Sequence, residues 1–260
     1  MASAALFLPD GPLIVPTGIT RGPWSEDAQH GGAAAALIAR EVERCETPVP
    51  MQVARLTIEL LRPVPIVPLR LQTEVRRRGR RIQLVAISVT AEDVEVASAV
   101  ALLIRIADVP IPPEALPGPT GLPSDPATAA VLPTMDGPES YVRDGVELRF
   151  AAGSFDAGPA TVWVRLRCPV VAGEDPTPLQ RLAAAADFGN GVSRLLPFED
   201  HLFMNPDLTI GVLRLPAGEW VGLDAVTHLS MSGTGQAEST LFDERGLLGR
   251  AVQSLFVDRR

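Results

Sequence analysis

The chain contains two series of short apolar runs, and an alanine-rich segment precedes each series. The runs are rich in Val, Ile, Leu and Thr, and charged or glycine-containing turns separate them, which is typical of strands in an antiparallel meander. The predicted strands are Val53–Leu61, Leu69–Arg76, Ile82–Thr90 and Glu95–Ile106 in the first series, and Leu208–Arg214, Trp220–Leu229, Gly235–Phe242 and Arg250–Val257 in the second.

The two alanine-rich segments, Gly31–Glu43 and Pro178–Val192, have the composition of helices. Alanine has the highest helix propensity, and both segments are long enough for three or four turns. A surface helix would carry a polar face, and Ala33–Ala39 has none. We therefore expect each helix to be buried, with an antiparallel sheet curled around it.

The two series align with each other at a constant offset. The segment ARLTIELLR at 54–62 matches PDLTIGVLR at 206–214, and Thr57 falls on Thr209, so that the offset is 209 − 57 = 152 residues. The same offset places Ala99–Val100 on Ala251–Val252 and needs no gap. The alignment predicts a duplicated α+β unit, because the repeats of a solenoid are much shorter.

Three regions follow from this repeat. We expect an N-terminal unit over residues 1–108, a proline-rich linker without regular structure over 109–138, and a C-terminal unit over 139–260.

Charge and cysteine content narrow the function. The net charge of −8 argues against a general nucleic-acid-binding protein, which needs basic surface to meet phosphate. Cys45 and Cys168 form neither a metal-ligand pattern nor a disulfide framework, which favours a reducing cytoplasm. No stretch reaches the roughly 18 apolar residues of a membrane helix. We predict a cytoplasmic protein with no metal, cofactor, nucleic-acid or membrane partner.

The second copy carries polar residues where the first has mainly small or apolar ones. Asp187 aligns with Ala35, Asn205 with Val53, Asp207 with Arg55, and Gln253 with Ala101. Each residue alone has a simpler interpretation: a carboxylate on the rim of a helix, a turn residue before proline, or an outward-facing strand residue. Together, at equivalent places in one copy, they predict an active site in the C-terminal unit.

The first copy offers His30, Gly31 and Gly32 at the start of its helix. Two glycines at this point allow a ligand to approach backbone N–H groups at the positive end of the helix dipole. An ordinary glycine-containing helix start is the alternative. We interpret His201 and His228 as structural or surface residues, and the arginine cluster Arg76–Arg81 as a hairpin tip or a phosphate clamp.

The order and spacing of several short motifs resemble the TesB-like (type II) acyl-CoA thioesterases. The carriers of the resemblance are Gln29–Gly32, Leu60–Pro63, Ala186–Asp187, Gly218–Trp220, Asp243–Gly246 and Ala251–Gln253. The resemblance covers nearly the whole chain outside the linker. It implies a double hotdog fold, in which each of two tandem units wraps a curved antiparallel sheet around a central helix. It also implies hydrolysis of an acyl-CoA substrate.

In that family an Asp on the second helix, a Thr or Ser on the next strand and a Gln on the last strand activate a water. The first and last roles map onto Asp187 and Gln253. The middle role maps onto Asn205, which has an amide in place of the hydroxyl. Thr209 is a second candidate, and two-residue alternation places Asn205, Asp207 and Thr209 on one face of the strand.

The mechanism implied is attack of a water, activated by Asp187, on the thioester, with the oxyanion held by N–H groups near Gly31 and Gly32. A non-catalytic acyl-binding protein is an alternative. A hotdog hydratase or dehydratase is less favoured, since it needs an Asp–His or His–Glu pair and the second copy has no histidine at an equivalent position. Sheet edges that can pair further predict a homo-oligomer.

Overall fold

One large antiparallel sheet forms the framework of the computed structural model, which describes residues 4–118, 120–132 and 137–260. The sheet has 14 strands in the order β1-β2-β4-β5-β6-β3-β11-β14-β13-β12-β9-β8-β7, and β10 pairs with β14 beside this path. The strands of the first half are β1 (Phe7–Asp10), β2 (Leu13–Pro16), β3 (Met51–Glu59), β4 (Leu69–Arg77), β5 (Ile82–Ala91) and β6 (Val94–Arg105). The later strands are β7 (Ala130–Val131), β8 (Val146–Ala152), β9 (Ala160–Leu166), β10 (His201–Met204), β11 (Asp207–Val212), β12 (Val221–Leu229), β13 (Thr234–Asp243) and β14 (Gly246–Arg259).

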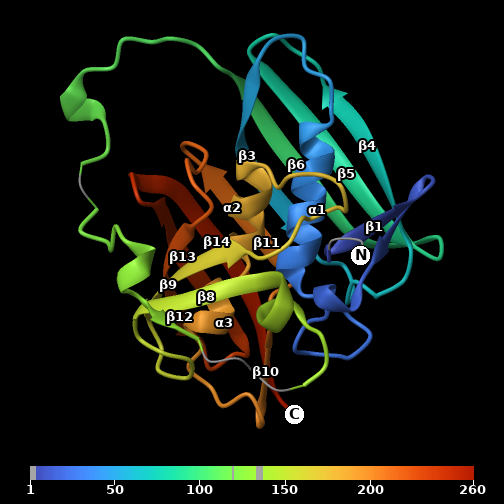
Figure 1. The fold of residues 1–260 in the computed structure, drawn as a ribbon, viewed down its shortest axis with the longest axis vertical. Coiled ribbons are helices and arrows are strands. Elements are labelled where there is room, and N and C mark those ends of the chain that lie inside the picture. Colours follow the sequence, from blue (N-terminus) through green and yellow to red (C-terminus); the bar gives the residue numbers. More distant parts are fainter. Residues whose placement is uncertain (1–3, 119, 133–136) are drawn as a thin grey trace.

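The two main helices, α1 (Gly31–Glu43) and α2 (Pro178–Ala186), pack against each other in the middle of the molecule (Figure 1). Their alanines are almost completely buried: Ala33–Ala36 expose at most 4% of their surface and Ala183–Ala186 at most 1%. Such small side chains allow a helix to lie close to its neighbours on all sides. The predicted bounds of the first helix and the predicted burial of both are confirmed.

The halves join through the pairing of β3 with β11. In this register Thr57 lies opposite Thr209, with Leu56 opposite Ile210 and Ile58 opposite Leu208. The 152-residue offset relates Leu56 to Leu208 and Ile58 to Ile210, so the two flanking pairs are the same pair with the halves interchanged. A local two-fold axis therefore passes between the two threonines. The threonine Oγ1 atoms lie 3.3 Å apart across this axis. The repeat read in the sequence is therefore also a relation in space.

Several elements differ from the sequence-based expectation. The second helix ends at Ala186, and a separate short turn, α3 (Gly189–Val192), follows it. The hairpin of β1 and β2 and the short strand β10 were not predicted. The linker was expected to lack regular structure, which is wrong at three places: the single 3₁₀ turns Pro113–Ala115 and Pro126–Thr128, and β7. In the part of the chain that the structure describes, no helix combines the length and apolar character needed to span a bilayer.

Candidate active site

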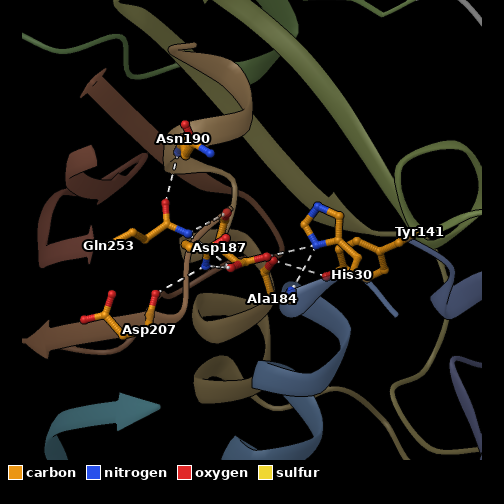
Figure 2. A network of polar contacts seen from close by, with 9 residues as sticks. His30, Tyr141, Ala184, Asp187, Asn190, Asp207 and Gln253 are labelled. Carbon is orange, nitrogen blue, oxygen red and sulfur yellow. Dashed lines mark hydrogen bonds and ion pairs between the residues drawn. The ribbon is translucent and has the colours of Figure 1, made fainter. Parts of the chain in front are cut away.

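Asp187 lies at the break between α2 and α3, where its carboxylate faces the start of α1 (Figure 2). Thr177 is the N-cap of α2, and its hydroxyl oxygen accepts a hydrogen bond from the Gln180 backbone N–H at 3.2 Å. The helix then runs along α1 until Ala186. Asp187 exposes only 7% of its surface, so its charge must be compensated by nearby donors.

Two side-chain amides supply this compensation at one carboxylate oxygen. Asn205 Nδ2 donates to Asp187 Oδ1 at 2.9 Å, and Gln253 Nε2 donates to the same atom at 3.1 Å. The amide of Gln253 is held in this orientation because its Oε1 accepts from the Asn190 backbone N–H at 3.0 Å. The structure thus brings together three of the four predicted catalytic residues, Asp187, Asn205 and Gln253.

A break in the strand turns Asn205 toward Asp187. β10 and β11 both pair with β14, and the chain leaves the ladder between them at Asn205–Pro206. The first half has a bulge at the equivalent place, between Val53 and Arg55 on β3. A bulge re-aims the side chains on either side of it, so the irregularity belongs to the repeated framework.

Thr209 is not part of this cluster. It lies opposite Val252 on β14, and paired residues point to the same face of a sheet, so Thr209 points away from the face that carries Gln253. Its hydroxyl contacts Thr57 at the local two-fold axis. The prediction that alternation places Asn205, Asp207 and Thr209 on one face is therefore wrong, because the strand is interrupted after Asn205.

His30 reaches Asp187 from the other half of the chain. His30 is the N-cap of α1, and its Nδ1 lies 3.0 Å from Asp187 Oδ2. The same nitrogen lies 3.0 Å from the backbone N of Gly32, in the geometry of an N-cap hydrogen bond. Both side chains are nearly buried, with 11% of His30 and 5% of Asp187 exposed.

The two glycines are required by the packing of the second half. A Cβ on Gly31 would lie 2.7 and 2.8 Å from the carboxylate oxygens of Asp187, and one on Gly32 would lie 2.7 Å from the carbonyl oxygen of Ala184. Gly31 also lines the cavity described below. Within the described residues its backbone N–H has no acceptor, whereas the Gly32 nitrogen lies 3.0 Å from His30 Nδ1. Gly31 is thus the better placed of the two to bind a ligand oxygen.

Tyr141 and Phe188 hold the imidazole ring of His30 in place. The ring centroid of His30 lies 4.7 Å from that of Tyr141 and 4.8 Å from that of Phe188. The hydroxyl of Tyr141 donates to the Ala184 carbonyl at 3.1 Å. Complete burial raises the pKa of Tyr141 well above 10, and the charge of Asp187 adds to this effect. Tyr141 therefore stays a neutral donor. Tyr141 was not predicted, and the one feature that distinguishes it in the sequence is that it is the single tyrosine of the chain.

A cavity of about 530 Å³ opens beside Asp187 and takes its walls from both halves. Five of the eight phenylalanines and one of the three tryptophans of the chain line it. Arg21 and Arg62 also line it, and neither forms an ion pair with a carboxylate among the described residues. The Arg76–Arg81 cluster lies around the β4–β5 turn and does not line the cavity. The site combines an apolar slot, a buried carboxylate and two guanidinium groups without a carboxylate partner, of which that of Arg21 donates to the backbone carbonyls of Glu26 and Glu139.

Two family models match the chain, one in each half. The acyl-CoA thioesterase N-terminal domain matches residues 20–104, and the acyl-CoA thioesterase C-terminal domain matches residues 113–257. The chain belongs to the acyl-CoA thioesterase family. A search of curated proteins finds no match.

Solved structures show that this thioesterase-family chain has the hotdog fold. A conserved protein of unknown function with hot dog fold from Alicyclobacillus acidocaldarius is 16% identical and has a TM-score of 0.73, with 98% of this chain and 95% of that chain covered. An acyl-CoA thioesterase II, TesB2, from Mycobacterium marinum is 18% identical with a TM-score of 0.64, and 90% of each chain is covered. A tesB protein from Mycobacterium avium subs paratuberculosis is 16% identical, with a TM-score of 0.61 and coverage of 95% and 93%.

The structure of this thioesterase-family chain corrects one expectation about its histidines. A hydratase was set aside because no histidine occupies an equivalent position in the second copy. The structure does contain an Asp–His pair, but its two members come from different halves, His30 from the first and Asp187 from the second. The search for a histidine considered the second copy alone, so it could not find a contact between residues of different copies. The lack of a second-copy histidine therefore does not separate the two reactions.

Proposed function

We propose that the protein hydrolyses acyl-CoA thioesters to a free acid and coenzyme A, using a water activated at Asp187. The observation that carries the proposal is the buried carboxylate of Asp187, held by Asn205 and Gln253 at the wall of an apolar cavity. An acyl chain matches the apolar slot. The phosphates of coenzyme A match Arg21 and Arg62, because guanidinium groups bind phosphate well.

The architecture we propose is a double hotdog. Residues 1–108 and 139–260 each form one unit, and residues 109–138 connect them. The local two-fold axis between Thr57 and Thr209, with one long helix on each side of it, supports this assignment. Assembly into a homo-oligomer stays a prediction from the sequence.

The reaction has three parts at this site. The activated water adds to the thioester carbonyl, and the C–O bond that forms places negative charge on the carbonyl oxygen. The Gly31 N–H, at the positive end of a 13-residue helix, is placed to stabilise this charge. The C–S bond then breaks, its electron pair goes to the sulfur of coenzyme A and the proton taken from the water neutralises that sulfur, while the acid stays in the slot until it is released. Asn205 and Gln253 keep the carboxylate of Asp187 in position throughout.

A thiol-release assay over a series of acyl-CoA chain lengths tests the proposal, with Asp187→Asn as the variant that excludes a contaminating hydrolase. We expect the wild-type protein to release coenzyme A and the variant to be slower by about 10²–10⁴-fold, the usual contribution of a positioned proton acceptor. Tight acyl-CoA binding without thiol release would instead establish a binding protein. Hydration of a 2-enoyl-CoA without thiol release would establish a hydratase.

A further inference from the structure

The Nδ1 atom of His30 has two partners that make opposite demands on it. Asp187 Oδ2, at 3.0 Å, is an acceptor and needs a proton on Nδ1. The Gly32 backbone N–H, also at 3.0 Å, is a donor and needs a lone pair there. A neutral imidazole nitrogen offers one or the other. The partner that prevails decides which ring nitrogen of His30 carries the proton.

Asp187 is the stronger partner. A hydrogen bond to a carboxylate is about twice as strong as one between neutral groups. The Asp187 carboxylate is also nearly buried, and a buried charged group costs more to leave without a hydrogen-bond partner than a buried neutral group such as the Gly32 N–H. The proton therefore lies on Nδ1, and the lone pair of the ring lies on Nε2. Figure 2 shows this second nitrogen directed away from Asp187.

The Nε2 atom is in the right place to meet a substrate. His30 lines the cavity, and its Nε2 has no hydrogen-bond partner among the described residues. The atom is also not completely buried, so it is accessible from the cavity. Tyr141 and Phe188 both pack against the ring and restrict its rotation, so they help to fix the direction of Nε2.

The oxygens of Asp187, by contrast, are already engaged. Oδ1 accepts from both Asn205 and Gln253, and Oδ2 faces His30. This arrangement suits a group that orients a histidine and balances its charge.

We infer that Asp187 activates the water through His30, whose Nε2 takes the proton from the water and later gives it to the sulfur of the leaving coenzyme A. This inference rests on the proposed thioester hydrolysis and identifies the proton carrier within it. As the water oxygen bonds to the acyl carbon, one of its protons moves to Nε2, and the resulting imidazolium faces the Asp187 carboxylate. When the C–S bond breaks, the electron pair goes to sulfur and the Nε2 proton follows. The products are the acid and the thiol, and His30 returns to its starting state.

The tautomer can be read directly by NMR. The chain has three histidines, so ¹⁵N-histidine labelling gives a spectrum in which His30 is assigned by its loss in His30→Asn. We expect the Nδ1–H tautomer in the wild-type protein. We expect a change to the Nε2–H tautomer in Asp187→Asn, where the Gly32 N–H no longer competes with a carboxylate. A wild-type protein with the proton on Nε2 would overturn the inference.

Kinetics test the same assignment independently. His30→Asn keeps an N-cap acceptor for Gly32 but has no proton to exchange, and His30→Gln is a second variant in case the first does not fold. We expect kcat to fall by about 10²–10⁴-fold with a much smaller change in KM. His228→Asn is the matched control, because His228 is 64% exposed on β12. If the wild-type protein hydrolyses acyl-CoA and a folded His30 variant keeps its kcat, His30 only caps the helix. A wild-type protein without thioesterase activity would instead refute the proposed function, and the tautomer measurement would remain.

Discussion

The two halves of the molecule share one framework and divide its chemistry between them. Where the second half has Asp187, Asn205 and Gln253, the first has Ala35, Val53 and Ala101 at the same offset. Both halves have an irregularity at the equivalent place, a bulge within β3 and a break between β10 and β11, and they meet at equivalent threonines. The first half contributes helix-end groups, His30 and the Gly31 N–H. After duplication, the second copy acquired a cluster of polar residues, while the first copy kept small or apolar residues at the equivalent positions.

The contact between the halves is matched in size. Gly31 lies against the Asp187 carboxylate, and the residue equivalent to Gly31 in the second half is Ala183. Asp187 is larger than its counterpart Ala35, and Gly31, which it contacts, is smaller than its counterpart Ala183. This is the packing consequence of placing a carboxylate between two closely packed helices.

Gly31→Ala should disrupt this match in size, and we expect the largest effect among the variants that keep both His30 and Asp187. The new methyl group would lie 2.7 Å from Asp187 Oδ2, so the carboxylate must move. A misplacement of about 1 Å at an active site costs on the order of 100-fold in rate, and we expect a fall of that size in kcat. Ala183→Gly is the control in the other half: it should cost about 0.5–1 kcal/mol of stability and leave kcat unchanged. Equal rates for the two variants would refute the size argument.

Asn205, at the break between β10 and β11, is a polar residue that the first half lacks. Asn205→Ala removes one of the two amide donors to Asp187 Oδ1, and we expect kcat to fall about tenfold, in line with the loss of one hydrogen bond to a charged group. Asn205→Thr should recover part of this loss, because a hydroxyl can also donate to the carboxylate. Thr209→Val should have a smaller effect than Asn205→Ala, since Thr209 points to the other face of the sheet. Steady-state kinetics on the three variants decide the order.

Arg214 and Arg62 differ in their ion pairing. We expect this difference to affect the free energy of unfolding and to have the smallest effect on kcat. These arginines are equivalent in the repeat, but Arg214 pairs with Asp243, whereas position 91, equivalent to 243, is Ala91. Burial of Asp243 opposes its ionisation, yet hydrogen bonds from Arg214 and from the N–H groups of Ala217 and Arg245 outweigh it, so its pKa is lowered. A lowered pKa stabilises the fold at neutral pH, and this contribution is lost as the pH falls below about 4.

We therefore expect Asp243→Asn to lower the free energy of unfolding at pH 7 by about 1–3 kcal/mol, less than for a fully buried pair because Arg214 is one-third exposed. The kcat of the folded variant should match the wild-type value. Urea unfolding at pH 7 and again near pH 3 checks the sign, since the gap between wild type and variant should narrow in acid. A gap that widens in acid would show that the pair does not stabilise the ionised form of Asp243.

The repeat and most strands could be predicted because apolar periodicity and alanine content are local properties. The bounds of α1 came from this reasoning, whereas the grouping of Asp187 with Asn205 and Gln253 came from aligning the two copies and from the family resemblance. Alternation failed at Asn205 because it assumes an unbroken strand, and the chain leaves the ladder at Pro206. The contact of His30 with Asp187 was not predictable in the same way. It depends on how α1 and α2 pack, which no comparison within a single copy contains.

A double-mutant cycle on His30 and Asp187 tests most directly the central claim that the two halves build one active site. The measurement is kcat for acyl-CoA hydrolysis by the wild-type protein, His30→Asn, Asp187→Asn and the double variant. Residues that act as a unit are strongly non-additive. We expect each single variant to lose about 10²–10⁴-fold in kcat and the double variant to be no slower than the slower single variant. Losses that multiply in the double variant would show that the residues act independently and would contradict the account.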